Sequence, residues 1–327
     1  MQFNSVRLHF VDDAKGLAIY SVILVHLNTF LDWDSQALTY VIHSYFMPLF
    51  FFISGYLCFK NEKIDIHLFI NKKIKQLIVP FFTSSLAICV LYSIMFDITL
   101  LDRYIFDSSK GGYWFLIVLF IFNCIYVLCV LVISSIKINI NKGILFVFVL
   151  LFIWLLLCMI SMIISEQISY LFSLSELRRF YPSFFLGILA KKYISNVNIW
   201  DNKVMCLSGL TYFLLLFYGY NDKTVVGFFM WLIASISACL FILNLFRLIN
   251  KSVPLLSTYG RNSLGIYIYH YIFIYILKLL IPISLLNKFS GEIILLSFIF
   301  LSFIIAELSI ILIRLTNKLK ISFIIGA

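Results

Sequence analysis

Long apolar runs separated by short polar stretches dominate the sequence. A membrane-spanning helix needs about 20 mostly apolar residues. In a bilayer only helices and closed barrels satisfy every backbone hydrogen-bonding group, and unbroken runs of this length favour helices. The pattern therefore predicts an all-α integral membrane protein with about ten transmembrane helices. The predicted spans are residues 15–31, 40–59, 77–97, 114–136, 143–165, 179–195, 204–220, 225–246, 262–283 and 292–314.

The charged residues between the runs alternate in sign along the chain. Lys and Arg in short loops mark the cytoplasmic side of a membrane protein. The basic connections carry Arg7, Lys15, Lys60, Lys63, Lys72, Lys73, Lys75, Lys137, Lys142, Lys191, Lys192, Lys203, Arg247, Lys251, Arg261, Arg314, Lys318 and Lys320. The mainly acidic connections carry Asp32, Asp34, Asp97, Asp102, Asp107, Glu166, Asp222 and Glu292. The alternation predicts that the N- and C-termini are both cytoplasmic.

Composition agrees with a membrane protein over the whole chain. Of the 327 residues, 63% are hydrophobic and 12% are charged, and the mean hydropathy is +1.05. Soluble domains carry about twice that charged fraction. The stretches between spans are short, so we expect a single transmembrane domain over residues 1–327 and no appended soluble domain. The net charge of +10 reflects membrane topology, and we expect no nucleic-acid partner.

The seven cysteines indicate neither a disulfide framework nor a metal site. They lie mostly within apolar runs at irregular spacing. Cysteine in such positions behaves as a small hydrophobic side chain. We therefore expect no bound metal.

Ionisable side chains inside the apolar runs are few, and each is a candidate functional group because a charge within the bilayer is costly. His26, His270 and Glu307 lie inside spans. Lys15 precedes His26 by eleven residues. At about 100° per residue the two share almost one helix face, roughly 16 Å apart along the axis. The imidazole of His26 can accept a hydroxyl proton near neutral pH, or it can simply bond a neighbouring helix.

The cytoplasmic segment 70–80 carries three lysines directly before a span, among them Lys72 and Lys75. Such a run is usually an orientation signal. Ammonium groups also bind phosphates, and Lys15 belongs to the same face. A nucleotide-bearing cofactor would rest its phosphates there and point its reactive end toward His26.

Two further sites are candidates, and the first of them leaves two alternatives open. Arg178 and Arg179 fall on the predicted outer side, against the positive-inside trend. They either bind an anionic headgroup, such as a lipid-linked sugar diphosphate, or pair with Glu176 or Glu166. In the second span Ser54 stands beside a glycine, which favours close helix approach.

Six segments taken together resemble membrane acyltransferase family 3, in particular its sugar O-acetylase branch. In chain order they are DDAKG followed by His26, MPLFFFISGY, the basic run ending in Pro80, WFL at 114–116, FFLGILAKK at 184–192 and GRNSLGIYIYH at 260–270. The resemblance implies an enzyme of the bacterial cytoplasmic (inner) membrane. It would move an acyl group from cytoplasmic acyl-CoA to a glycan at or beyond the outer face, and our leading hypothesis for the donor is acetyl-CoA.

The resemblance also implies roles for individual residues. His26 matches the family's catalytic histidine, and Lys15 matches the basic residue eleven positions before it. Lys72 and Lys75 match a paired-arginine motif that holds the CoA phosphates, and Arg261 is a further candidate for that contact. Asp12 would steady Lys15 through an i,i+3 contact or belong to the pocket itself.

Two departures from the family pattern bear on these roles. Lysine in place of arginine at positions 72 and 75 removes bidentate phosphate recognition. Relatives in the sugar O-acetylase branch often carry a second histidine where this chain has Phe46. His43, about one turn earlier, is a candidate to replace it.

The leading hypothesis is a membrane O-acetyltransferase whose partners are acyl-CoA, a glycan or lipid-linked glycan acceptor, and membrane lipids. Direct transfer and a covalent intermediate both remain open. An alternative is a transporter or flippase for a polyprenyl-linked saccharide, with Glu307 and His270 as internal relay groups. A third is a scaffold for glycan assembly. The missing internal repeat and the presence of both Lys15 and His26 favour the enzyme.

Overall fold

The computed structural model describes residues 8–33, 35–60, 64–96, 110–136, 141–193, 201–249, 251–282 and 288–326. These residues are largely helical and contain no strand. They form two compact units. The first unit comprises the described residues within Met1–Ile53 and Tyr193–Lys318, and the second those within Ser54–Lys192 and Leu319–Ala327. Of the charges used for the topology prediction, Arg7, Asp34, Lys63, Asp97, Asp102, Asp107 and Lys137 lie outside the described residues.

The prediction of an all-α membrane protein is confirmed for the described residues. Seven of their helices are long and apolar enough to cross a bilayer. They are Gln36–Cys58, Ile66–Val90, Trp114–Ser135, Lys142–Ile163, Val225–Ile249, Ser263–Leu280 and Gly291–Lys318. The count of ten and the cytoplasmic placement of both termini stay predictions.

The other three predicted spans are also helical, but each is more polar or shorter than the seven. Helix α1 (His9–Phe30) carries polar side chains along its length, and α10 (Leu174–Tyr193) carries charged side chains at both ends. Helix α11 (Asn202–Tyr218) has 17 residues. A polar helix in an apolar environment needs partners for its polar groups. The contacts of α1 supply them, as described below.

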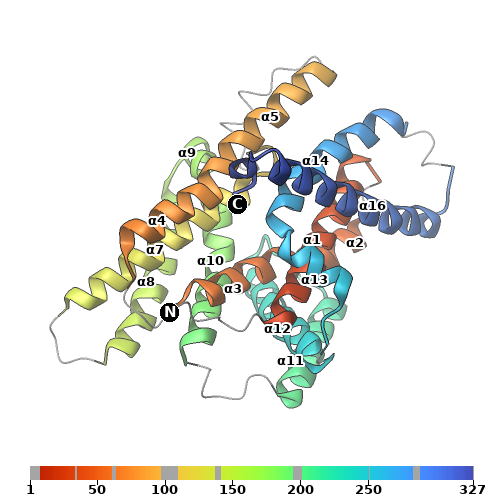
Figure 1. Cartoon of the computed structure of the whole chain (residues 1–327). Helices are drawn as coiled ribbons and strands as arrows, with labels where there is room; N and C mark the ends of the chain where they lie inside the picture. Colours follow the sequence, from red (N-terminus) through yellow and green to blue (C-terminus); the bar gives the residue numbers. More distant parts are fainter. Residues whose placement is uncertain are drawn as a thin grey trace. The chain divides into compact units, whose positions relative to one another are not determined.

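Helix α1 is contacted by α2 (Gln36–His43) and by four further helices of the first unit (Figure 1). These are α12 (Val225–Ile249), α13 (Pro254–Arg261), α14 (Ser263–Leu280) and α16 (Gly291–Lys318). The apolar side chains of α1 are mostly buried between them.

Two glycines let α1 and α13 pack backbone against backbone. A Cβ atom at Gly16 would overlap the carbonyl oxygen of Leu256, and one at Gly260 would overlap the carbonyl oxygen of Asp12. Helices approach this closely only where small residues face the partner. The sequence pattern did not predict α13 as a separate helix. Its start at Pro254 fits the preference of proline for the first helical position.

The predicted span 40–59 is divided into two helices, α2 (Gln36–His43) and α3 (Phe46–Cys58). At the break, the Ser44 hydroxyl donates to the carbonyl of Val41 at 2.6 Å and bonds the Tyr212 hydroxyl of α11 at 2.9 Å. Serine competes in this way with backbone hydrogen bonds and favours turns.

In the second unit, α4 (Ile66–Lys73), a π-helical turn η1 (Ile74–Ile78) and α5 (Val79–Phe96) follow one another in a single rod (Figure 1). The π-helical turn was not predicted. Single π turns inside α-helices occur often at functional sites. Here the turn falls within the basic run.

The rest of the second unit is built from η2, α7, α8, α9, α10, the end of α3 and a short C-terminal turn, η3. Their bounds are Lys110–Gly112 for η2, Trp114–Ser135 for α7, Lys142–Ile163 for α8, Glu166–Phe172 for α9 and Ser322–Ile325 for η3. A Cβ atom at Gly55 would overlap the carbonyl oxygen of Phe184 in α10. The predicted close helix approach beside Ser54 is therefore confirmed.

The contact between α1 and α13 predicts that Gly260→Val destabilises the protein. The added side chain meets the backbone of Asp12, which cannot rotate away. Overpacking of this kind costs about 1–3 kcal/mol. Thermal unfolding in detergent should show a lower midpoint. Gly291→Ala is the control, because a Cβ there lies 3.7 Å from the ring of Trp33, an ordinary contact. An unchanged midpoint for Gly260→Val would contradict the packing described.

Candidate active site

Helix α14 brings His270 to His26 of α1, 244 residues away in the chain. His26 Nδ1 and His270 Nε2 are 2.8 Å apart. The two rings are nearly parallel, with centroids 5.1 Å apart and an interplanar angle of 11°. The His270 side chain is fully buried, whereas His26 is half-buried. His26 is thus the more accessible imidazole of the pair.

The surrounding hydrogen bonds assign the proton positions of both rings in their neutral forms. His270 Nδ1 lies 3.1 Å from the carbonyl oxygen of Ile266. A carbonyl only accepts, so His270 Nδ1 carries the proton and His270 Nε2 is an acceptor. His26 Nδ1–H therefore donates to His270. His26 Nε2 is left as an acceptor, and the Tyr271 hydroxyl lies 3.2 Å from it.

This arrangement leaves His26 Nε2 unprotonated, which is the form that a general base requires. A catalytic histidine is commonly oriented by an acceptor on its other nitrogen, which holds the tautomer and stabilises the imidazolium formed when the base takes a proton. His270 Nε2 is that acceptor here, in the position that a carboxylate takes in the Ser-His-Asp triad. The sequence analysis named both histidines but predicted no contact between them. It missed Tyr271, although this residue directly follows the GRNSLGIYIYH segment.

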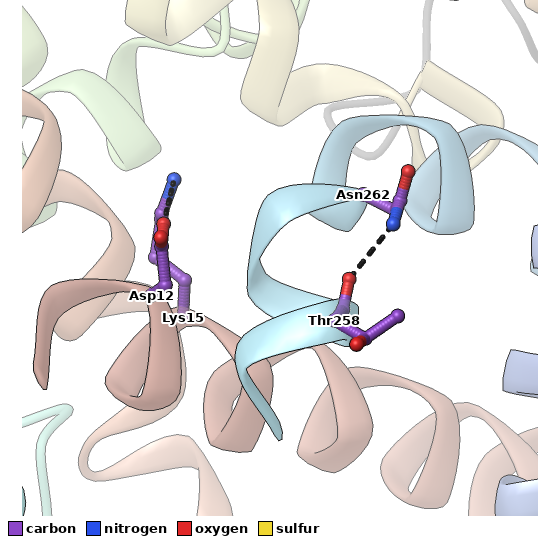
Figure 2. Close-up of polar contacts among 4 residues, drawn as sticks. All are labelled: Asp12, Lys15, Thr258 and Asn262. Atoms are coloured by element: carbon purple, nitrogen blue, oxygen red, sulfur yellow. Dashed lines mark hydrogen bonds and ion pairs between the residues drawn. The ribbon is translucent and has the colours of Figure 1, made fainter. Parts of the chain in front are cut away.

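At the beginning of α1, Lys15 and Asp12 form the predicted i,i+3 contact. Lys15 Nζ lies 3.8 Å from Asp12 Oδ1, and both side chains extend from the same side of the helix (Figure 2). The Lys15 side chain is 22% exposed and that of Asp12 only 6%. Helix α1 is unbroken from His9 to Phe30, so the predicted separation of Lys15 and His26, roughly 16 Å along the axis, applies.

Asp13 was not predicted to have a role, although it stands beside Asp12 in the DDAKG segment. It is fully buried, and its Oδ2 accepts the backbone N–H of Val253 at 3.3 Å. Val253 immediately precedes α13, and its own side chain cannot form a capping hydrogen bond. The Asp13 carboxylate of α1 therefore caps the beginning of α13. Burial raises the pKa of Asp13, while the nearby positive charges of His9 and Arg261 oppose the shift.

Arg261 comes to the same end of α1 as Lys15. It is the last residue of α13, and the preceding Gly260 packs on the Asp12 backbone. The exposed guanidinium donates from Nη2 to Thr258 Oγ1 at 3.2 Å. Asn262 closes the helix by donating from Nδ2 to the Thr258 carbonyl at 2.8 Å (Figure 2). Two cations on adjacent helices thus lie at the end of α1 that was predicted to be cytoplasmic.

Glu307 of α16 is held by α13. The hydroxyl of Tyr259, whose side chain is fully buried, donates to Glu307 Oε1 at 2.9 Å. This bond fixes α13 against α16. The transporter alternative assigned relay roles to Glu307 and His270, but each is bonded to a specific neighbour in the first unit.

The remaining candidate histidine, His43, lies on α2. Its side chain is exposed, and its ring packs against Phe46 at a centroid distance of 5.2 Å. His270 accepts the hydrogen bond of His26 Nδ1, and the replacement of the second family histidine by His43 stays a prediction.

The comparison with protein families agrees with the resemblance drawn from the sequence. A family model described as an acyltransferase domain matches residues 8–314, nearly the whole chain. The chain belongs to membrane acyltransferase family 3. A search of curated proteins and a search of solved structures each gave no match. The family match and the apolar helices together identify this protein as a multi-pass membrane acyltransferase.

In this acyltransferase the basic run belongs to the second unit. Lys72 and Lys75 are exposed, at the end of α4 and within η1. Lys73 is half-buried, with its ammonium 5.5 Å from the centroid of the Phe69 ring. Two of the three lysines thus present their charges outward.

The C-terminal tail of the acyltransferase packs against this basic run, although it lies beyond the residues that the family model matches. The Thr83 hydroxyl of α5 donates to the carbonyl of Ile324 at 3.3 Å, and Ile325 is buried. Gly326 has a positive φ of 72°, and a Cβ atom there would lie 2.5 Å from the carbonyl oxygen of Gln76 in η1. The tail therefore supports the π-helical turn.

Arg178 and Arg179 lie on α10 next to Glu176. Burial raises the pKa of Glu176, and the positive charges of Arg179 and Arg178 oppose that shift. The Arg178 carbonyl accepts Trp154 Nε1–H at 3.1 Å, and the Arg179 guanidinium lies 5.9 Å from the Phe180 ring. Of the two predicted alternatives, the electrostatic contact with Glu176 is present, and headgroup binding stays a prediction.

The seven cysteines of the acyltransferase all lie among the described residues as free thiols. The described residues contain no group of three or more His, Cys, Asp or Glu side chains placed to hold a metal ion.

The tail contact predicts that Gly326→Val loosens η1. Valine is strained at a positive φ and also meets the Gln76 backbone. Hydrogen–deuterium exchange of the amides in Ile74–Ile78 should rise about tenfold, which corresponds to about 1.4 kcal/mol. Gly219→Val is the matched control, because φ there is +78° but nothing lies within 4 Å of the added Cβ. An unchanged rate of amide hydrogen exchange in η1 would show that the C-terminal tail does not stabilise this turn.

Proposed function

We propose that this membrane acyltransferase moves an acetyl group from acetyl-CoA to a hydroxyl of a cell-surface polysaccharide or of its lipid-linked precursor. The 2.8 Å hydrogen bond between His26 and His270 carries this proposal, because it leaves His26 Nε2 as an oriented base. Family membership supports acyl transfer as the reaction class. We assign the enzyme to the cytoplasmic membrane of a bacterium.

In the proposed reaction the proton of the acceptor hydroxyl ends on His26 Nε2. The hydroxyl oxygen attacks the carbonyl carbon of the thioester, the C–S bond breaks, and the CoA thiolate takes the proton from the imidazolium. His270 is a positioning residue. It is fully buried and acts through His26 by holding its tautomer.

The CoA phosphates are proposed to bind at the beginning of α1. Lys15 and Arg261 offer two cations there, on helices held together by Gly16 and Gly260. The phosphate-binding role that the family resemblance implies for Lys72 and Lys75 of the second unit stays a prediction from the sequence. An acyl group on the far end of the donor would extend along α1 toward His26.

The proposed base predicts that His26→Ala abolishes transfer. Loss of a general base lowers kcat about 10²–10⁴-fold. The assay follows acceptor-dependent release of free CoA thiol by the protein in detergent or nanodiscs. O-acetyl content of the surface polysaccharide, measured by NMR, checks the acceptor in cells. His67→Ala is the control, because that histidine is exposed on α4. A His26→Ala protein that still acetylates the acceptor at the wild-type rate would refute the mechanism.

The proposed phosphate contact predicts a different kinetic signature for Lys15→Ala. Removing one ammonium from a phosphate site should raise KM for acetyl-CoA about tenfold, equal to about 1.4 kcal/mol, with a smaller change in kcat. Lys15→Arg should restore most of the affinity because the charge is kept. A Lys15→Ala enzyme with unchanged KM but depressed kcat would place Lys15 at the reacting groups instead.

A further inference from the structure

The Nε2 atom of His26, which is the proposed base, is already hydrogen-bonded to a hydroxyl group of the protein. The Tyr271 oxygen lies 3.2 Å from His26 Nε2, and the only proton available to that bond is the phenolic one, because Nε2 is an acceptor. His26 is therefore held through both ring nitrogens by consecutive residues of α14. His270 Nε2 accepts a hydrogen bond from His26 Nδ1–H, and the Tyr271 hydroxyl donates one to His26 Nε2.

Tyr271 is confined where it stands. Its side chain is 2% exposed. Its ring centroid lies 4.2 Å from that of His270, 4.8 Å from that of His26 and 5.8 Å from that of Phe30. Moving the phenol off Nε2 would disrupt these ring contacts and leave a buried hydroxyl in need of a new partner. The lone pair of His26 Nε2 is thus already engaged by the Tyr271 hydroxyl.

We propose that Tyr271 is a catalytic residue that carries the proton of the acceptor hydroxyl to His26. This inference rests on the proposed function. A hydroxyl can accept one hydrogen bond while it donates another. In the proposed relay the acceptor O–H donates to the Tyr271 oxygen while Tyr271 keeps its own hydrogen bond to His26 Nε2.

The proton transfers balance without any further reactant. As the acceptor oxygen forms its bond to the thioester carbonyl carbon, its proton passes to the Tyr271 oxygen and the phenolic proton passes to His26 Nε2. The C–S bond breaks and the thiolate leaves. Tyr271 then takes the proton back from His26 Nε2 and releases its own proton to the thiolate, so both residues return to their starting forms.

The sugar hydroxyl is the class of acceptor that this relay fits. An alcohol needs its proton removed as it attacks, whereas an amine acceptor can attack while neutral and lose its proton afterwards. Through the Tyr271 hydroxyl, His26 can remove the proton of the acceptor alcohol while the alcohol oxygen attacks. The relay thus deepens the proposed O-acyl transfer.

The test compares wild type, Tyr271→Phe and Tyr269→Phe in single-turnover acetyl transfer. Tyr269 is a buried tyrosine two residues earlier on α14 and is the matched control. Tyr271→Phe should lower the rate about 10²-fold with KM for acetyl-CoA within about twofold of wild type. Tyr269→Phe should react as wild type does. An unchanged rate in Tyr271→Phe would overturn the relay.

Rates in mixtures of H₂O and D₂O separate a relay from a merely structural role. In wild type, two protons move in the transition state, so the rate should fall with deuterium fraction along a curve. In Tyr271→Phe the residual rate should fall linearly. A linear dependence in wild type would overturn the relay. Mass-spectrometric detection of an acetyl group on Tyr271 would do so as well, because the phenol would then be a nucleophile.

If Tyr271→Phe does not fold, 3-fluorotyrosine at position 271 keeps the shape and the hydroxyl. The relay requires the single-turnover rate to change with the acidity of the phenol, and an unchanged rate would overturn it. The two proposals fail differently. A wild-type protein that releases no CoA thiol with any glycan acceptor contradicts the proposed function, whereas an active wild type with an equally active Tyr271→Phe contradicts only the relay.

Discussion

Polar side chains on α1 must find hydrogen-bond partners in apolar surroundings, and the first unit is organised by that requirement. An unpaired buried polar group costs several kcal/mol in a membrane. Asp13 Oδ2 accepts the Val253 N–H at the beginning of α13, and the Ser21 hydroxyl bonds that of Tyr45, in the turn between α2 and α3, at 2.7 Å. His26 is satisfied by α14, and Asn28 by Thr39 of α2, at 2.8 Å. These four polar positions on α1 thus bond four different parts of the first unit.

The same constraint favours a neutral imidazole as the hydrogen-bond partner of His26 Nδ1. A carboxylate beside His26 would be a permanent charge in a buried place, with a large desolvation cost. His270 carries no charge in the resting state, and its other nitrogen ends on the Ile266 carbonyl, four residues back on the same helix. The network is therefore neutral until a proton arrives.

Helix α13 shows how a short segment can position charge. It is capped by Asp13 at its beginning, packed on α1 through Gly260, and bonded to α16 through Tyr259 and Glu307. Its last residue, Arg261, is consequently held at the end of α1 that carries Lys15. The carboxyl groups of Asp13, which is buried, and of Glu307, which is half-buried, thus help to place this helix.

The sequence by itself determined the helical class, most helix positions and the geometry of Lys15 relative to His26, because all of these follow from local periodicity and hydropathy. Its motifs also identified the family. Only the tertiary structure decided that His270 and Tyr271 clamp His26, that Asp13 caps α13, and that a π-helical turn interrupts the basic run. The partners of His26 and Asp13 are about 240 residues away in the chain. Which groups meet across such a distance depends on how whole helices pack, and no local pattern specifies that.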